Sequence, residues 1–473
     1  MERVVFPHNK KQKQEGTLSM TMKKVTLEEI QTTLKTNGLP FKDTLSGIIG
    51  PMINEHQPDH RVRVYPPEVV VFGMIAQALN PRGSLKSTVA RVNANRIRQG
   101  LPLASINTAA YSDARKRFNT DILINSTMEV ARIAESQAKP WSWRGFSVSA
   151  FDGTGLTAND TDANQKAFPQ HAKQKEGAGF PLIRLVILQS LSTGMIQGAD
   201  YAKFKGKETG EMALARSLLP LLSKGDLLLG DRYYPSFFLM AYLRKSGIEG
   251  VFQSHGARSV DFRVGQSLGS LDHIVTWDKP NRPSWMSQEE YDQYPTSIRL
   301  REVDVTKQIG CKDRFVIVTT LLGSKKYSRK NLAKLYKRRW QIELALRDLK
   351  TVMGLDHVAA ETPEMIKKEI WSHFLAYNAL RHHIANAASL GKLTVDQISV
   401  TTAINVISVN EANIMNAKKS SIPGLMAALY FQMLQCPVNR RPGRKEPRAV
   451  KRRPKSRKRL GEPRKAWKHR AAA

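Results

Sequence analysis

The order of short apolar segments between residues 146 and 256 constrains the fold of this chain more than any other feature. Three strand-like segments come first, and the tight turn Ser192–Gly194 joins the second to the third. A helical segment, a strand, another helical segment and a further strand follow, so the order is β, β, β, α, β, α, β. Strands that alternate with helices are typical of a sheet covered by helices, and we therefore expect an α/β fold. The segments are 146–156, 181–204 (two strands and their turn), 209–225, 226–234, 235–247 and 248–256.

The regions on either side of this block differ from it in composition and in predicted secondary structure. Residues 26–144 consist mainly of short basic helical segments, which suit a DNA-contacting module, although a helical bundle with a basic face is the alternative. Residues 256–312 are rich in Gly, Pro and Asp and contain short alternating runs, and the apolar run 314–322 follows. We divide the chain into a flexible leader (1–25), a helical DNA-binding N-terminal domain (26–144), a core in two parts (145–255 and 326–390), a β-rich insertion with its return strand (256–325), a helical C-terminal region (391–436) and a basic disordered tail (437–473).

The net charge of +33 favours a polyanionic partner, most often nucleic acid. Residues 440–470 contain sixteen Lys or Arg residues and two Glu residues, so this segment supplies +14 of the total. The other +19 is spread over the rest of the chain, and the folded part should carry a positive surface too. We expect the tail to contact DNA, and a solubilising arm is the alternative.

The sequence also bears on the compartment. It has no stretch of 18 apolar residues, which argues against a transmembrane helix, and its first 16 residues lack the apolar core of a secretory signal. The two cysteines, Cys311 and Cys436, form neither a disulfide framework nor a zinc cluster and suit a reducing compartment. We expect a cytoplasmic, nucleoid-associated bacterial protein without membrane contact.

The segment Tyr336–Lys350, "YKRRWQIELALRDLK", reads as one helix with a charged stripe. At 100° per residue, Arg339, Glu343 and Lys350 fall within about 60° of Tyr336, and the apolar side chains fall on another face. The stripe therefore borders the buried face, where a sheet edge could meet it. The alternative is a solvated surface on which Glu343 only pairs with arginines one turn away, for about 0.3–0.5 kcal/mol each.

Two aspartates far upstream give Glu343 possible companions. Asp152 and Asp231 each end an apolar strand segment, and if those strands are neighbours in one sheet, the two carboxylates can converge at its C-terminal edge. Taken singly, Asp152 could form a turn and Asp231 could cap a helix. If Glu343 packs against the same sheet edge, the three carboxylates form an oxygen-ligand site suited to Mg²⁺, for which Mn²⁺ can substitute.

These motifs together resemble the DDE transposases of the bacterial insertion-sequence family numbered four. The resemblance rests on "FDGTGL", on "LLLGDRYY" and on the spacing Tyr-x2-Arg-x3-Glu-x6-Lys, and it covers residues 145–385. It implies a ribonuclease H-like mixed sheet flanked by helices, with a β insertion between Asp231 and Glu343, which are 112 positions apart. It also implies that Asp152, Asp231 and Glu343 form the catalytic, metal-binding triad.

The resemblance further implies which residues contact DNA. Arg339 and Lys350 would bind DNA near the transposon end, with Tyr336 nearby on phosphate. In related enzymes that form hairpins, a tryptophan of the β insertion stacks on a flipped base. Trp277 and Trp285 are the candidates in this chain, and Trp340 is a weaker one. An aromatic side chain in a β insertion can equally serve packing.

The resulting hypothesis is a cut-and-paste transposase acting on double-stranded DNA. It would cut at terminal inverted repeats with two metal ions and transfer the freed 3′-hydroxyl to target DNA, as a homodimer that holds two ends in a synaptic complex. One alternative is a DNA-binding regulator of transposition without catalysis. Another is a structure-specific nuclease on the same fold, which would cut without joining.

Overall fold

The computed structural model describes residues 25–37, 39–40, 45–60, 63–80, 83–438 and 462. The predicted flexible leader (1–25) and basic disordered tail (437–473) lie almost entirely outside the described residues. Within the described part of the chain, no helix is both long enough and apolar enough to cross a bilayer.

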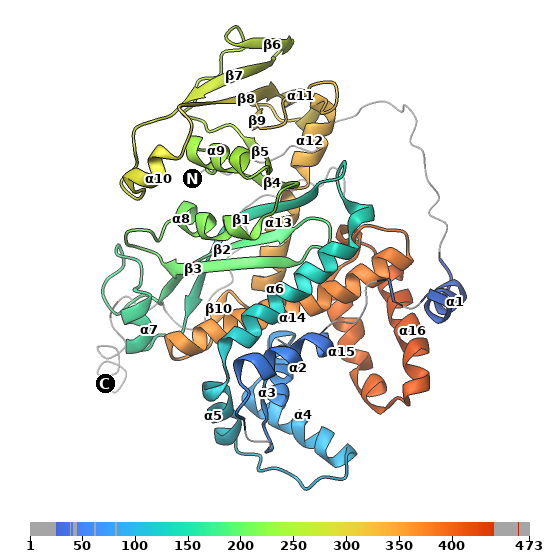
Figure 1. The fold of residues 1–473 in the computed structure, drawn as a ribbon. Coiled ribbons are helices and arrows are strands. Elements are labelled where there is room, and N and C mark those ends of the chain that lie inside the picture. Colours follow the sequence, from blue (N-terminus) through green and yellow to red (C-terminus); the bar gives the residue numbers. More distant parts are fainter. Residues whose placement is uncertain are drawn as a thin grey trace.

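One mixed sheet organises the molecule, with the strand order β3-β2-β1-β4-β5-β9-β8-β7-β6 and with β10 pairing beside β1 (Figure 1). Strands β1, β2 and β3 form an antiparallel meander, while β4 and β5 run parallel to β1. The α/β, ribonuclease H-like fold class is confirmed, and the predicted order of elements holds except for a short helix, Asp162–Ala167, between β1 and β2. The strands are β1 (Ser147–Ala158), β2 (Leu182–Ser190), β3 (Ile196–Lys203), β4 (Asp226–Gly230), β5 (Glu249–Gln253), β6 (Gln266–Gly269), β7 (Asp272–Asp278), β8 (Ser297–Asp304), β9 (Val316–Thr319) and β10 (His357–Val358).

Strand β1 is longer than the sequence predicted. Asp152 was expected at the C-terminal end of a strand, but β1 continues through Gly153 and Gly155 to Ala158. The antiparallel ladder to β2 spans Ser149 to Thr157 and supplies hydrogen bonds that override the local preference of glycine for turns. Asp152 therefore lies in the middle of β1.

The predicted β-rich insertion extends the core sheet. Its last strand, β9, pairs antiparallel with β5, and β8, β7 and β6 continue outward from β9. Inside the insertion, Arg301 makes two hydrogen bonds of 2.7 and 2.6 Å to the carboxylate of Asp272, and both residues are buried. A buried pair with this geometry stays favourable only while both partners are present.

Helices cover both faces of the sheet, because the side chains of β1 alternate between two apolar layers (Figure 1). Val148 and Ala150 face the layer that includes α6 and α14, whereas Phe151 faces the layer that includes α8 and α9. On the side away from the sheet, α3, α15 and α16 pack against α14, while α2 packs against α6, α1 against α16, and α4 and α5 against α3 (Figure 1). The longer helices are α1 (Leu27–Asn37), α2 (Leu45–His56), α3 (Pro67–Ala78), α4 (Leu85–Arg98), α5 (Ala109–Arg117), α6 (Thr120–Gln137), α8 (Glu211–Leu218), α9 (Phe237–Lys245), α12 (Arg329–Lys337), α13 (Trp340–Arg347), α14 (Pro363–Leu390), α15 (Val400–Asn416) and α16 (Ile422–Gln435), and the short ones are α7 (Asp162–Ala167), α10 (Gln288–Asp292) and α11 (Thr306–Ile309).

Candidate functional site

Asp152 lies on β1, and Asp231 directly follows the neighbouring parallel strand β4. The ladder between β1 and β4 pairs Ser147 with Asp226 and continues in the same register for four residues. Extending this register two positions past Ala150 would bring Asp152 opposite Asp231, which follows β4 directly. Neighbouring strands are about 4.8 Å apart, so the two carboxylates share one edge of the sheet.

The segment that carries Glu343 consists of two helices instead of one. Helix α12 ends at Lys337 and α13 begins at Trp340, and a tighter turn joins them. In this turn the amide of Arg339 donates to the carbonyl of Tyr336 at 3.0 Å, three residues back. A π-helical turn, Asp348–Val352, follows α13. The uniform 100° spacing assumed for Tyr336–Lys350 is therefore wrong, because a three-residue turn rotates the chain faster than an α-helix and a π-turn more slowly.

Arg339 provides the positive charge next to these carboxylates. Its guanidinium donates to Glu343 Oε1 at 2.6 Å, with both side chains mostly buried. Burial raises the pKa of Asp152 to about 7, Arg339 opposes this shift, and the charges of Glu343 and Glu211 add to it. Burial also raises the pKa of Asp231, which the amide of Tyr233 and the charge of Arg339 oppose. We call Asp152, Asp231 and Glu343 the carboxylate edge.

The donor atoms of the carboxylate edge suit a hard divalent cation. Carboxylate oxygens are the ligands that Mg²⁺ and Mn²⁺ prefer, and a nearby cation stabilises the ionised form of a buried cluster of acids. Among the residues that the structure describes, however, no three His, Cys, Asp or Glu side chains are already arranged around a common metal position. Glu343 Oε1 accepts from Arg339, so metal binding through this oxygen would require the ion pair to open.

Lys350 and Tyr336 have different surroundings. Lys350 donates from Nζ to Thr154 Oγ1 at 3.1 Å and to the Gly155 carbonyl at 2.8 Å, just beyond Asp152 on β1. Tyr336 is only 2% exposed, and its hydroxyl donates to the carbonyl of Gly230 at 3.2 Å. The ring of Tyr336 is part of the core in this structure, so a contact with a DNA phosphate would need this segment to rearrange. Tyr336 instead supports the end of β4, next to Asp231.

The three candidate tryptophans differ in exposure. Trp277 is 5% exposed, its indole N–H donates to Glu302 Oε1 at 3.2 Å, and the Arg258 guanidinium covers its ring at 3.5 Å. Trp277 therefore packs the insertion and offers no free face to a base, contrary to expectation. Trp285 is 36% exposed and borders a cavity of about 140 Å³, and Trp340 is 44% exposed on α13.

Glu211 is a carboxylate that the sequence analysis did not include. It is the first residue of α8, and its Oε1 accepts a hydrogen bond from the Tyr234 hydroxyl at 2.6 Å. Its charge contributes to the raised pKa of Asp152, so it lies close to the carboxylate edge. A glutamate in the first turn of a helix is common, and nothing in the local sequence distinguishes Glu211 from an ordinary one.

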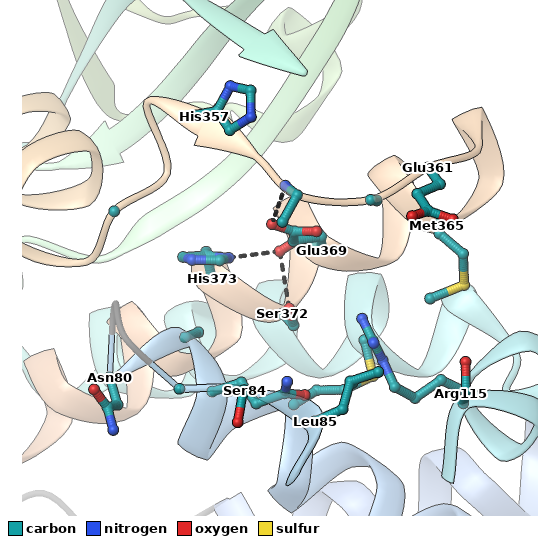
Figure 2. A pocket seen from close by; sticks show the side chains of 18 of the residues that line it. Asn80, Ser84, Leu85, Arg115, His357, Glu361, Met365, Glu369, Ser372 and His373 are labelled. Atoms are coloured by element: carbon teal, nitrogen blue, oxygen red, sulfur yellow. Dashed lines mark hydrogen bonds between the residues drawn. The ribbon is translucent and has the colours of Figure 1, made fainter. Parts of the chain in front are cut away.

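A separate cavity of about 660 Å³ lies between the N-terminal helices and α14 (Figure 2). Its lining includes Arg115, His357, Glu369 and His373. The Ser372 hydroxyl and His373 Nδ1 each contact the Glu369 carbonyl at 2.8 Å (Figure 2). These contacts belong to the backbone of α14, and no residue of the carboxylate edge lines this cavity.

Comparison with known proteins agrees with this geometry. The family described as Transposase DDE domain matches residues 143–379, a range that contains the whole carboxylate edge. The chain is similar to the transposase InsG for insertion sequence element IS4 of Escherichia coli (strain K12), with 24% identity over 401 residues that cover 83% of this chain and 87% of InsG. It is also 41% identical over 61 residues to the transposase for insertion sequence element IS421 of Escherichia coli, which covers 13% of this chain and 16% of that protein. The chain therefore belongs to the DDE transposases, in the family of IS4.

Proposed function

We propose that this transposase cuts DNA at the ends of an insertion sequence and transfers the freed 3′-hydroxyl to target DNA, with two metal ions at the carboxylate edge. The observation that supports the proposal is that Asp152 and Asp231 both lie just beyond the parallel ladder of β1 and β4, while the charge of Glu343 on α13 acts on both. Three carboxylates at one sheet edge, next to basic side chains, suit a reaction on a phosphodiester.

Asp152, Asp231 and Glu343 would hold the ions, Mg²⁺ or Mn²⁺. Bound there, such ions would activate water or a 3′-hydroxyl and stabilise the leaving oxygen. Arg339 now neutralises Glu343 and would turn to a DNA phosphate when Glu343 binds metal. Its planar guanidinium has more than one N–H donor for phosphate oxygens.

Lys350 and two tryptophans would hold the DNA strand. Lys350 is anchored to β1 beside Asp152 by two of its three N–H donors, which keeps its charge close to the strand being cut. Trp340 and Trp285 are more exposed than Trp277 and are the candidates to stack on a base, although the Arg216 guanidinium lies over the Trp285 ring at 3.7 Å and would have to move. The partners we propose are terminal inverted repeats and target DNA, with two copies of the chain holding two ends.

The test uses supercoiled plasmid that carries the element ends, with Mg²⁺ and a labelled target duplex. Wild-type protein should cut at the ends and join them to the target, and Glu343→Ala should do neither while binding end DNA normally. Glu361→Ala is a matched control, since Glu361 is exposed at the separate cavity. Cutting by Glu343→Ala at the wild-type rate would refute the proposal. Cutting by the wild type without joining would indicate a nuclease, and end binding without cutting would indicate a regulator.

A further inference from the structure

We propose that Glu211 is a positioning residue of the reaction, which holds the loop after β4 against β1 so that Asp231 stays level with Asp152. This inference rests on the proposed function and deepens it. Glu211 would act through Tyr234 and Gly153 and would not itself ligate metal.

The first contact ties Glu211 to the loop that carries Asp231. Tyr234 is 1% exposed, and its hydroxyl donates to Glu211 Oε1 at 2.6 Å. The amide of Tyr234 donates to the Asp231 carbonyl at 3.4 Å, and the amide of Tyr233 donates to Asp231 Oδ1 at 2.8 Å. Asp231 and Tyr234 thus belong to one short turn, and the hydrogen bond to Glu211 anchors the far end of this turn.

The second contact places Glu211 against the backbone of β1. A Cβ atom built on Gly153 would lie 2.5 Å from Glu211 Cδ and 2.8 Å from Oε2, closer than real Cβ contacts allow. The position next to Asp152 therefore has to be glycine while Glu211 occupies its present place. The Gly153 amide also donates to Asp152 Oδ1 at 2.9 Å, so the carboxyl group of Glu211 packs on the residue that orients Asp152.

The two contacts make Glu211 a bridge between the two strands. Strands β1 and β4 pair directly from Ser147 to Ala150 on β1, and this ladder stops two residues before Asp152. Beyond that ladder, the chain of contacts from Gly153 through Glu211 to Tyr234 joins the two strand ends. The rings of Phe151 and Tyr234, 5.6 Å apart, add an apolar contact below the bridge. The N-terminus of α8 favours the negative charge of Glu211.

The experiment compares Glu211→Ala, Glu211→Gln and Tyr234→Phe in the full chain. Single-turnover cutting of end DNA should fall about tenfold for Glu211→Ala and for Tyr234→Phe, the range of one hydrogen bond to a charged acceptor, with end affinity unchanged. Glu211→Gln keeps an acceptor for Tyr234 and should recover most of the loss. The double variant Glu211→Ala/Tyr234→Phe should be no slower than either single variant, because both remove the same bond.

Hydrogen exchange of the peptide 226–236 supplies a readout that does not depend on activity. Its protection should fall in Glu211→Ala and in Tyr234→Phe, and it should be restored in Glu211→Gln. Glu208→Ala is the control, because Glu208 precedes the same helix but is exposed and pairs with Arg216. If the wild type does not cut end DNA, the proposed function fails while the exchange measurement still decides the role of Glu211.

Two outcomes would overturn the inference. If Tyr234→Phe cuts normally while Glu211→Gln is as inactive as Glu343→Ala, Glu211 acts as a ligand and not through Tyr234. If the exchange of 226–236 is unchanged in Glu211→Ala, Glu211 does not hold the loop.

Discussion

Replacing Tyr336 with phenylalanine distinguishes a residue that supports β4 from one that contacts DNA. The change removes the buried hydroxyl, which donates to the Gly230 carbonyl at 3.2 Å and also interacts with Arg339, and it keeps the ring against Phe315. A hydrogen bond of this kind contributes about 1 kcal/mol net to stability. Because 3.2 Å is long for a hydroxyl donor, its contribution should lie at the lower end of the usual range of strengths. We expect the free energy of unfolding to fall by about 1 kcal/mol. Tyr336→Ala also removes the buried ring and should cost about 3–5 kcal/mol.

Two measurements check this prediction. Urea-induced unfolding reports the stability of wild type, Tyr336→Phe and Tyr336→Ala. Titration of labelled end DNA at several salt concentrations reports the affinity and its salt slope. Tyr336→Phe should leave both the affinity and the slope unchanged, because its hydroxyl is inside the protein. Lys350→Gln is the positive control and should weaken binding and lower the slope by about one, as expected when a single lysine no longer neutralises a phosphate.

The opposite pattern would refute the reasoning. If Tyr336→Phe is as stable as wild type but binds end DNA more weakly, with a smaller salt slope, then its hydroxyl contacts the DNA. The segment around Arg338 and Arg339 would in that case rearrange in the complex, and the buried position of Tyr336 would describe only the free protein.

Three further predictions concern charge. Because burial raises the pKa of Asp152 from 3.8 to about 7, the folded metal-free protein binds more protons than the unfolded chain between these pH values. Its free energy of unfolding should therefore fall by up to about 4 kcal/mol as pH rises through that window and then level off. Thermal melting in EDTA should show a smaller dependence on pH for Asp152→Asn, and an equal dependence would contradict the assignment. Deleting residues 440–473 should lower the salt slope of DNA affinity by about 0.9 for each phosphate that the tail neutralises, and an unchanged slope would mean that the tail does not contact DNA. Asp272→Ala leaves the charge of Arg301 buried without its partner and should cost about 3–5 kcal/mol in urea-induced unfolding, whereas Asp278→Ala, at an exposed position of the same strand, should cost little.

The local sequence pattern was sufficient to predict several features of this chain. The order of strands and helices from β1 to β5 could be predicted from the spacing of apolar residues and from the turn residues between them. Both signals lie within a window of about ten residues. Asp231 was expected directly after a strand and lies there, because the buried run before it is short and continuous. Glu343 was expected on a helix beside an apolar face, which α13 bears out.

The features that sequence reasoning missed all depend on contacts between distant segments. Asp152 lies within β1 because β2 pairs with the glycines that follow it, although these glycines read locally as a turn. Tyr336 and Trp277 are buried by partners in β4 and β8, about 100 and 25 residues away in the chain. Glu211 approaches Gly153 only because α8 packs on β2 and β3, which lie beside β1 in the sheet. Periodicity along one segment predicts which face is apolar, but the partner that covers a face, or pairs with a strand edge, is chosen by the packing of the whole chain.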